Sequence, residues 1–237
     1  MRTRIAIKLL LLYLFAASLS FAQPKDEPQN KLVQFQMALI RKGPKWTDKK
    51  SIEIKKLHEK HFNYVLSLLD SGKAVIAGPT TEGGDLLGVF ILRARSTEEA
   101  RAWIENDPEV KAGRLKSEIH PWWSEDIFKK ANSPLKMTTV YLGFLKRGPN
   151  RKPGDGNTPE VQELQKAHMA NINRLAETRK LVMAGPFGDD GDLRGIFVFR
   201  TESLKEAEEL TATDPMIKID RLRLELHPWQ VPAGVIP

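Results

Sequence analysis

Residues 107–122 read DPEVKAGRLKSEIHPW, and residues 214–229 read DPMIKIDRLRLELHPW. Both stretches open with Asp-Pro and close with His-Pro-Trp, and they align without a gap. The correspondence continues back to His61 in the first copy and His168 in the second, with roughly 40% of the aligned positions identical. The chain is therefore an internal duplication, and its candidate functional residues come in matched pairs.

The order of apolar and polar runs is the same in both copies. It predicts strands in the first copy over residues 32–40, 74–77, 86–92 and 114–122, with helices over 48–70 and 96–104. It predicts strands in the second copy over residues 138–145, 181–184, 193–200 and 221–229, with helices over 159–178 and 203–212. Strand-helix-strand-strand-helix-strand is the order of a ferredoxin-like domain. The sequence thus predicts an α+β protein of tandem ferredoxin-like βαββαβ repeats.

The domain boundaries follow from the repeat and from shifts in composition. We predict a first repeat over residues 31–123, a polar linker over 124–136 and a second repeat over 137–230. The second repeat carries an insertion after its first strand, residues 150–157, which is rich in glycine, proline and charge. We expect this insertion to be a mobile surface loop.

The first 22 residues have the pattern of an export signal. Basic residues precede an apolar run at residues 9–15, and residues 20–22 form a small-x-small cleavage site. We expect residues 1–22 to be a signal peptide that is removed before Gln23, which makes the mature protein periplasmic or secreted. The apolar run is too short to span a bilayer, so we expect no membrane attachment of the mature form.

The composition narrows the classes of function. No cysteine is present, which excludes a disulfide framework, a lipoprotein anchor and a thiolate nucleophile. The formal charge of +7 falls to +4 without the signal peptide, and no basic stripe with interleaved aromatic residues is present, so we expect no nucleic-acid partner. Serine-hydrolase, P-loop, dinucleotide and zinc-protease motifs are missing, so we expect no cofactor.

Two histidines at matched positions are the leading candidates for chemistry. His61 and His168 each lie in register with the apolar face of the first predicted helix of their copy. A histidine on that face is either a buried structural residue or, with a carboxylate to orient its ring, a proton acceptor near neutral pH. His58 aligns with Gln165 and is set aside because it has no counterpart.

Asp107 and Asp214 are the candidate carboxylates. Each precedes a proline, and Asp at the N-cap with Pro at the first helical position is an ordinary way to begin a helical turn. The two roles are compatible, because one carboxylate oxygen can cap the turn while the other accepts a hydrogen bond from an imidazole. A helix N-terminus also favours the ionised carboxylate that an orienting partner requires.

Other shared residues have structural explanations beside functional ones. The Gly-Pro pairs at residues 78–79 and 185–186 are predicted to end a strand at a sharp turn, which is a structural explanation. A position on the rim of a pocket is the functional alternative. For the His-Pro-Trp motifs that begin at His120 and His227, a structural role is favoured, with proline limiting edge pairing and tryptophan closing the core.

Two further interpretations stay open. A metal site built from His61, Asp107 and His120 is conceivable, although the spacing contains no compact ligand motif. The basic turns at residues 41–42 and 146–147 either attract an anionic substrate or are simply solvated.

The ordered set of these residues resembles the YCII-related family. The segments that carry the resemblance are the helix with His61, AGP at 77–79, STEEA at 96–100, DPEVKAG at 107–113 and Pro-Trp at 121–122. The resemblance covers nearly all of both copies. It implies a dimeric α/β barrel and a proposed His and Asp active site, which here is His61 with Asp107 and His168 with Asp214. We accordingly predict that the two repeats pack on each other as an intramolecular dimeric α/β barrel.

The resemblance also bears on activity, because the family includes a chlorohydroxyhydroquinone dehydrochlorinase. It implies a small-molecule lyase or isomerase in which the histidines remove a proton and the aspartates hold the tautomer. The second copy departs from the usual pattern at Arg179 and at Ile219-Asp220, which favours the first site. The alternative is a non-catalytic module that binds a small ligand or assembles, since fold does not fix function. The substrate and any further homo-oligomer are left open.

Overall fold

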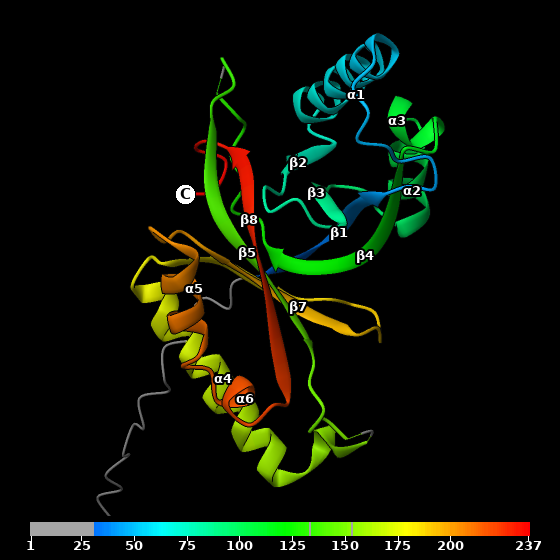
Figure 1. Ribbon diagram of the computed structural model, residues 1–237. Helices are drawn as coiled ribbons and strands as arrows, with labels where there is room; N and C mark the ends of the chain where they lie inside the picture. Colours follow the sequence, from blue (N-terminus) through cyan, green and yellow to red (C-terminus); the bar gives the residue numbers. More distant parts are fainter. Residues whose placement is uncertain (1–30, 133, 153) are drawn as a thin grey trace, which may run out of the picture. The chain divides into compact units, whose positions relative to one another are not determined.

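The computed structural model describes residues 31–132, 134–152 and 154–237, and the predicted signal peptide lies outside this part of the chain. The first repeat contains β1 (Leu32–Lys42), α1 (Ile52–Asp70), β2 (Ala74–Pro79), β3 (Leu86–Leu92), α2 (Thr97–Ile104), α3 (Pro108–Lys111) and β4 (Leu115–Glu125). The second contains β5 (Met137–Arg147), η1 (Asp155–Asn157), α4 (Pro159–Glu177), β6 (Leu181–Pro186), β7 (Leu193–Phe199), α5 (Leu204–Thr211), α6 (Pro215–Lys218) and β8 (Leu222–Pro232) (Figure 1). The predicted βαββαβ order is confirmed in both repeats.

Hydroxyl side chains set where the longer helices begin. The side-chain oxygen of Ser51 accepts a hydrogen bond from the backbone N–H of Ile54, so α1 starts later than the pattern predicted. Ser96, Thr158 and Ser203 cap α2, α4 and α5 in the same way. Within the described residues, no helix is long and apolar enough to cross a membrane.

The backbone path is kept even where the glycines of the first repeat are replaced. Gly72 and Gly113 have positive φ angles of 72° and 73°. Their counterparts Arg179 and Asp220 adopt φ angles of 58° and 55°, a conformation that costs a non-glycine residue energy. The departures in the second copy therefore change side chains and not the course of the chain.

Each repeat forms a four-stranded antiparallel sheet, with strand orders β2-β3-β1-β4 and β6-β7-β5-β8. The edge strands of the two sheets meet, because β2 contacts β8 and β4 contacts β6. Antiparallel bridges join Thr80 to Trp229 and Trp122 to Phe187 at these two edges. The two repeats therefore close on each other as the predicted intramolecular dimeric α/β barrel.

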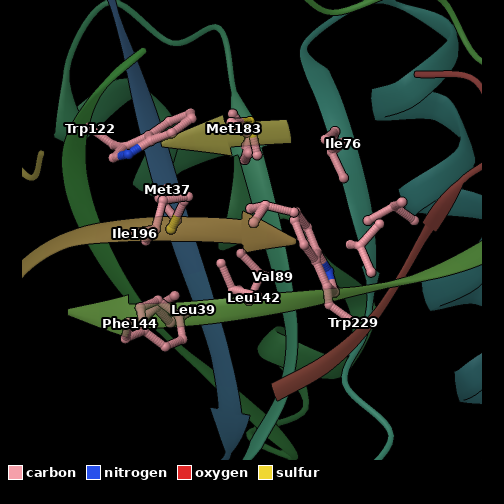
Figure 2. Packing of buried hydrophobic residues seen from close by; sticks show 14 of the residues in the cluster. Met37, Leu39, Ile76, Val89, Trp122, Leu142, Phe144, Met183, Ile196 and Trp229 are labelled. Carbon is pink, nitrogen blue, oxygen red and sulfur yellow. The ribbon is translucent and has the colours of Figure 1, made fainter. Parts of the chain in front are cut away.

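The faces of the two sheets that point toward each other share one apolar core. Figure 2 shows side chains from both repeats interleaved there, and nearly all of them are fully buried. The first repeat supplies Met37, Leu39, Ile76, Val89 and Trp122, and the second supplies Leu142, Phe144, Met183, Ile196 and Trp229. Each repeat also has a smaller apolar core of its own, which lies between its sheet and its helices. Burial of this apolar surface is the main force that holds the repeats together.

The Gly-Pro and His-Pro-Trp motifs meet where the barrel closes. The indole N–H of Trp229 donates to the carbonyl of Gly78 at 3.0 Å, and that of Trp122 donates to the carbonyl of Gly185 at 3.1 Å. A Cβ atom on Gly78 would lie 1.8 Å from the backbone oxygen of Gln230. Position 78 thus requires glycine mainly because a strand of the other repeat comes so close, and not because the chain turns sharply there.

The predicted linker and the predicted mobile loop both make specific contacts. In the connection from β4 to β5, Phe128 packs edge-on against Phe35 at 5.1 Å between ring centroids. In the loop after β5, expected to be mobile, the carboxylate of Asp155 forms two hydrogen bonds with the guanidinium of Arg221, at 2.6 and 2.9 Å. The charged insertion is therefore anchored to the residue that directly precedes β8.

Candidate functional site

The first candidate pair is formed as the sequence predicted. His61 projects from α1, and its Nδ1 lies 2.6 Å from Oδ2 of Asp107. The other carboxylate oxygen, Oδ1, accepts hydrogen bonds from the backbone N–H groups of Glu109 and Val110 at 2.8 and 3.4 Å. Capping and orientation are thus performed by one side chain. Because an ionised carboxylate only accepts hydrogen bonds, Nδ1 carries the proton and Nε2 is the basic nitrogen.

Tyr64 lies one helical turn beyond His61 on α1 and fixes the helix against α2. Its hydroxyl donates a 2.7 Å hydrogen bond to the carbonyl of Trp103. Burial and the negative charge of Asp107 raise the pKa of Tyr64. The phenol therefore stays a neutral hydrogen-bond donor.

The second candidate pair repeats this geometry in a more enclosed setting. Nδ1 of His168 on α4 lies 2.6 Å from Oδ2 of Asp214, while Oδ1 accepts a 2.9 Å hydrogen bond from the N–H of Met216. The side chain of Asp214 is fully buried, and the ring of His168 stacks on Phe197 at 6.2 Å. This pair fastens α4 to α6 and to the sheet below.

The two pairs differ in the space beside them. His61 lines a cavity of about 1150 Å³ between α1 and the sheet of the first repeat. Strands of the second repeat contribute Met137 and Gln230 to its wall. The corresponding cavity of the second repeat is about 310 Å³, and His168 is not among its lining residues. His61 therefore faces space that can hold a small molecule, whereas the side chain of His168 is more enclosed, at 10% exposed against 18% for His61.

Nε2 of His61 is available to such a molecule. Its side chain is 18% exposed, and Nε2 has no hydrogen-bond partner among the described residues. A base with one ring nitrogen fixed by a carboxylate and the other open to a cavity is suited to proton transfer.

Alignment of the two copies set His58 aside, but the structure places it at the same site. Its ring stacks on His61 with centroids 5.6 Å apart, and its Nδ1 lies 3.3 Å from Oε1 of Glu109. Glu109 is buried, and the same oxygen lies 3.9 Å from Nε of Arg114. The second repeat has Gln165 and Met216 where the first has His58 and Glu109. The two copies differ at both positions of this contact, and that paired difference was the signal in the sequence.

The remaining matched histidines join the two repeats. Nδ1 of His120 lies 2.6 Å from Oδ2 of Asp189, and Nδ1 of His227 lies 2.5 Å from Oε1 of Glu82. Each carboxylate belongs to the repeat that does not contain the histidine. His120 therefore does not join His61 and Asp107 in a metal site. In residues 31–132, 134–152 and 154–237, no three His, Cys, Asp or Glu side chains are grouped to hold a metal ion.

The basic turns are also engaged elsewhere. Arg41 forms ion pairs with Asp85 and Glu118 at 3.3 and 3.1 Å, and Lys146 pairs with Glu225. Neither Arg41 nor Lys146 lines the cavity beside His61. The cationic residues that do line it are Lys49, Lys50, Lys55 and Arg114, which no motif in the sequence marked.

Comparison with known proteins agrees with this geometry at the level of family and fold. The YCII-related domain matches the chain twice, over residues 36–123 and 141–230. The uncharacterized protein YjpA of Bacillus subtilis (strain 168) is 31% identical over 70 residues, which covers 30% of this chain and 80% of that protein.

Solved structures share the paired-repeat fold at low sequence identity. A mutant chlorite dismutase from Candidatus Nitrospira defluvii has a TM-score of 0.55 at 13% identity, covering 84% of this chain and 91% of that one. A heme-binding protein from Thermus thermophilus has a TM-score of 0.51 at 16% identity, covering 84% and 92%. At such identities the likeness establishes the fold alone.

Proposed function

This chain belongs to the YCII-related family, and on that premise we propose that it is a small-molecule enzyme of the lyase or isomerase kind. His61 is its general base, and Asp107 orients and stabilises that base. The observation that carries the proposal is the 2.6 Å contact between His61 Nδ1 and Asp107 Oδ2 on the wall of a large cavity. His168 and Asp214 form the equivalent pair, but the enclosed setting gives them the smaller share of any turnover.

The chemistry follows from the two ring nitrogens. Nε2 of His61 takes a proton from a carbon next to a carbonyl or from an acidic hydroxyl, and the electron pair of the broken bond passes to the substrate as an enolate or phenolate. Asp107 stabilises the resulting imidazolium without taking its proton. Return of the proton to a different atom completes an isomerisation. Departure of a leaving group with its electron pair from the neighbouring carbon completes an elimination.

Deuterium exchange tests this proposal without knowledge of the natural substrate. We would follow the incorporation of deuterium from D₂O into the carbon next to the ketone of phenylpyruvate and related apolar 2-oxo acids by proton NMR. The wild-type chain is expected to exceed the buffer rate, His61→Ala to lose most of the excess, and His168→Ala to keep it. Equal exchange by the wild type and a His61→Ala, His168→Ala double variant would end the proposal, as would the absence of exchange with every acid.

A second candidate function is non-catalytic binding of a small ligand. The observation that favours it is the second repeat, where the same His-Asp pair exists and His168 does not line the cavity of about 310 Å³. The pair therefore has a structural use of its own, which fastens a helix to the turn that Asp caps. On this account the cavity of the first repeat stores or carries its ligand unchanged.

Haem is one ligand whose chemistry the lining residues fit. Nε2 of His61 would supply a nitrogen ligand, and its ring is held by the carboxylate of Asp107, an arrangement that strengthens metal binding. Apolar side chains such as Phe62 and Phe90 would cover the macrocycle, and Lys49 and Lys50 are suited to its propionates. Haem, when bound, would supply redox chemistry, while the protein would hold it through His61.

Absorption spectroscopy separates the two candidates. A sharpened and shifted Soret band on addition of hemin to the full chain, lost in His61→Ala and kept in His168→Ala, would support haem binding. An unchanged hemin spectrum together with deuterium exchange would support the enzyme.

We also propose that the protein acts outside the cytoplasm after cleavage before Gln23, from the pattern of residues 1–22. N-terminal sequencing of the protein recovered from the periplasm or medium of its producing cells tests this. A first residue other than Gln23 would contradict it.

A further inference from the structure

In both repeats a buried arginine directly precedes the strand that follows the capped turn. Arg114 in the first and Arg221 in the second are 8% and 7% exposed. Each donates a 3.3 Å hydrogen bond from Nη1 to a backbone carbonyl, that of Thr47 or that of Asn150. In each the buried Nε has no hydrogen-bond partner. The two arginines are thus held alike by their repeats.

They differ in what the end of the guanidinium binds. In the second repeat both terminal nitrogens of Arg221 bind the carboxylate of Asp155, which comes from the insertion after β5. The first repeat has no such insertion. Nη2 of Arg114 has no hydrogen-bond partner in the described part of the chain, and its nearest carboxylate is Glu109, at 3.9 Å from Nε. The second repeat therefore shows that an arginine at this position can bind a carboxylate, which there belongs to Asp155.

The surroundings of Arg114 suit an anion with an apolar body. Its guanidinium lies 4.8 Å from the ring centre of Trp46, and both residues line the cavity beside His61. Exposed Lys49, Lys50 and Lys55 line the same cavity. Two carboxylates, Asp48 and Glu109, also line the cavity, and the rest of the lining is largely apolar, with Phe62, Val65, Leu66, Leu69, Leu87 and Phe90.

We propose that the cavity of the first repeat binds an apolar carboxylic acid, with the carboxylate on Arg114 at the position that Asp155 occupies in the second repeat. This assignment deepens the proposed function, since it names the class of molecule brought to His61. It requires the cavity and Arg114 but not proton transfer by His61. Guanidinium and carboxylate form paired, charge-assisted hydrogen bonds, which are about twice as strong as neutral ones.

Calorimetric titration of the full chain at pH 7.5 with decanoate and with 1-decanol tests the proposal. The two probes share the same apolar chain and differ in charge at one end. Decanoate is expected to bind at least about tenfold more tightly than decanol, the effect of one charge-assisted contact. In Arg114→Met this preference is expected to fall to within about twofold, while the affinity for decanol is kept.

Matched variants distinguish a contact with Arg114 from an effect of net charge or of misfolding. Lys116→Met removes a positive charge from an exposed site on β4, two residues after Arg114 and outside the cavity, and is expected to keep the preference. Glu109→Gln removes the carboxylate nearest Arg114 and is expected to increase the preference a few-fold, which provides a test if Arg114→Met does not fold. Binding of the two probes does not require proton transfer, so failure of the enzyme proposal would leave this result intact.

Three outcomes would overturn the proposal. They are no binding of either probe, equal binding of both probes by the wild type, and a preference that survives in Arg114→Met. A preference that Lys116→Met abolishes to the same extent would also overturn it, because the effect would then come from net charge.

Discussion

At the scale of single residues, one aspartate per repeat performs two tasks. Asp107 caps α3 with one oxygen and orients His61 with the other, and Asp214 does the same for α6 and His168. The sequence predicted both tasks, because Asp-Pro marks a helix start and a histidine sits at a matched position. It did not predict Glu109 or Arg114, because their contacts join segments whose approach only the folded chain defines.

The buried pair of the second repeat allows the two tasks to be measured separately. Asp214→Ala removes the cap and leaves the buried Nδ1 of His168 without a partner, so we expect the free energy of unfolding to fall by about 2–4 kcal/mol. Asp214→Asn keeps an oxygen for the cap, and we expect a loss about half as large. Urea unfolding at neutral pH measures both values. Equal losses in the two variants would show that the cap contributes nothing.

At the scale of elements, the corresponding helices α1 and α4 bury different amounts of side chain. Both have 19 residues, yet α1 buries only Leu68, whereas α4 buries His168, Asn171 and Leu175. The predicted helices and strands agree with the structure because their apolar periods are clear. The difference in burial between α1 and α4 was not predictable from the sequence. A helix with a given amphipathic pattern can pack directly on a sheet or leave a cavity between itself and the sheet.

The insertion that covers the second repeat depends on an ion pair, which gives it a defined pH dependence. Hydrogen bonding to Arg221 lowers the pKa of Asp155 from its ordinary 3.8 to about 2. Because the pKa of Asp155 is lower in the folded than in the unfolded state, the ionised carboxylate stabilises the folded protein at pH values above the unfolded-state pKa. This contribution to stability is lost as the pH falls through about 2. We expect the NMR signal of the Lys152 amide, which donates to Asp155 at 3.2 Å, to titrate near this lower value.

The control for this titration is Asp155→Asn, in which the acid-dependent shift of the Lys152 signal should vanish. A midpoint near 3.8 in the wild type would mean that the pair with Arg221 is not formed in solution.

At the scale of the whole folded unit, residues 31–237, the two repeats are joined by matched contacts at both edges of the barrel. Trp122 and Trp229 donate across the edges, and His120 and His227 contact carboxylates of the opposite repeat. Duplication and family resemblance predicted the barrel. The partner carboxylates Glu82 and Asp189 lie in loops between strands, and no spacing in the sequence marked them.

The glycines at the edges are the most direct test of this closure. A Cβ atom at Gly78 would lie 1.8 Å from a backbone oxygen of β8, whereas one at Gly84 meets nothing within 4 Å. We expect Gly78→Ala to lower the free energy of unfolding in urea by about 1–3 kcal/mol or more, through forced separation of the strands. Gly84→Ala is expected to change it by less than about 1 kcal/mol. Similar losses in the two variants would contradict the close approach of the strands.

The central claim is that the first repeat holds an anion anchor and a base in one cavity, and a crystal structure of the chain with phenylpyruvate tests it most directly. The predicted result is the carboxylate on Arg114 and the carbon next to the ketone within roughly 3.5 Å of Nε2 of His61, the reach needed for proton transfer. Phenylpyruvate bound away from Arg114, or α1 packed on the sheet with no cavity beside His61, would contradict the claim.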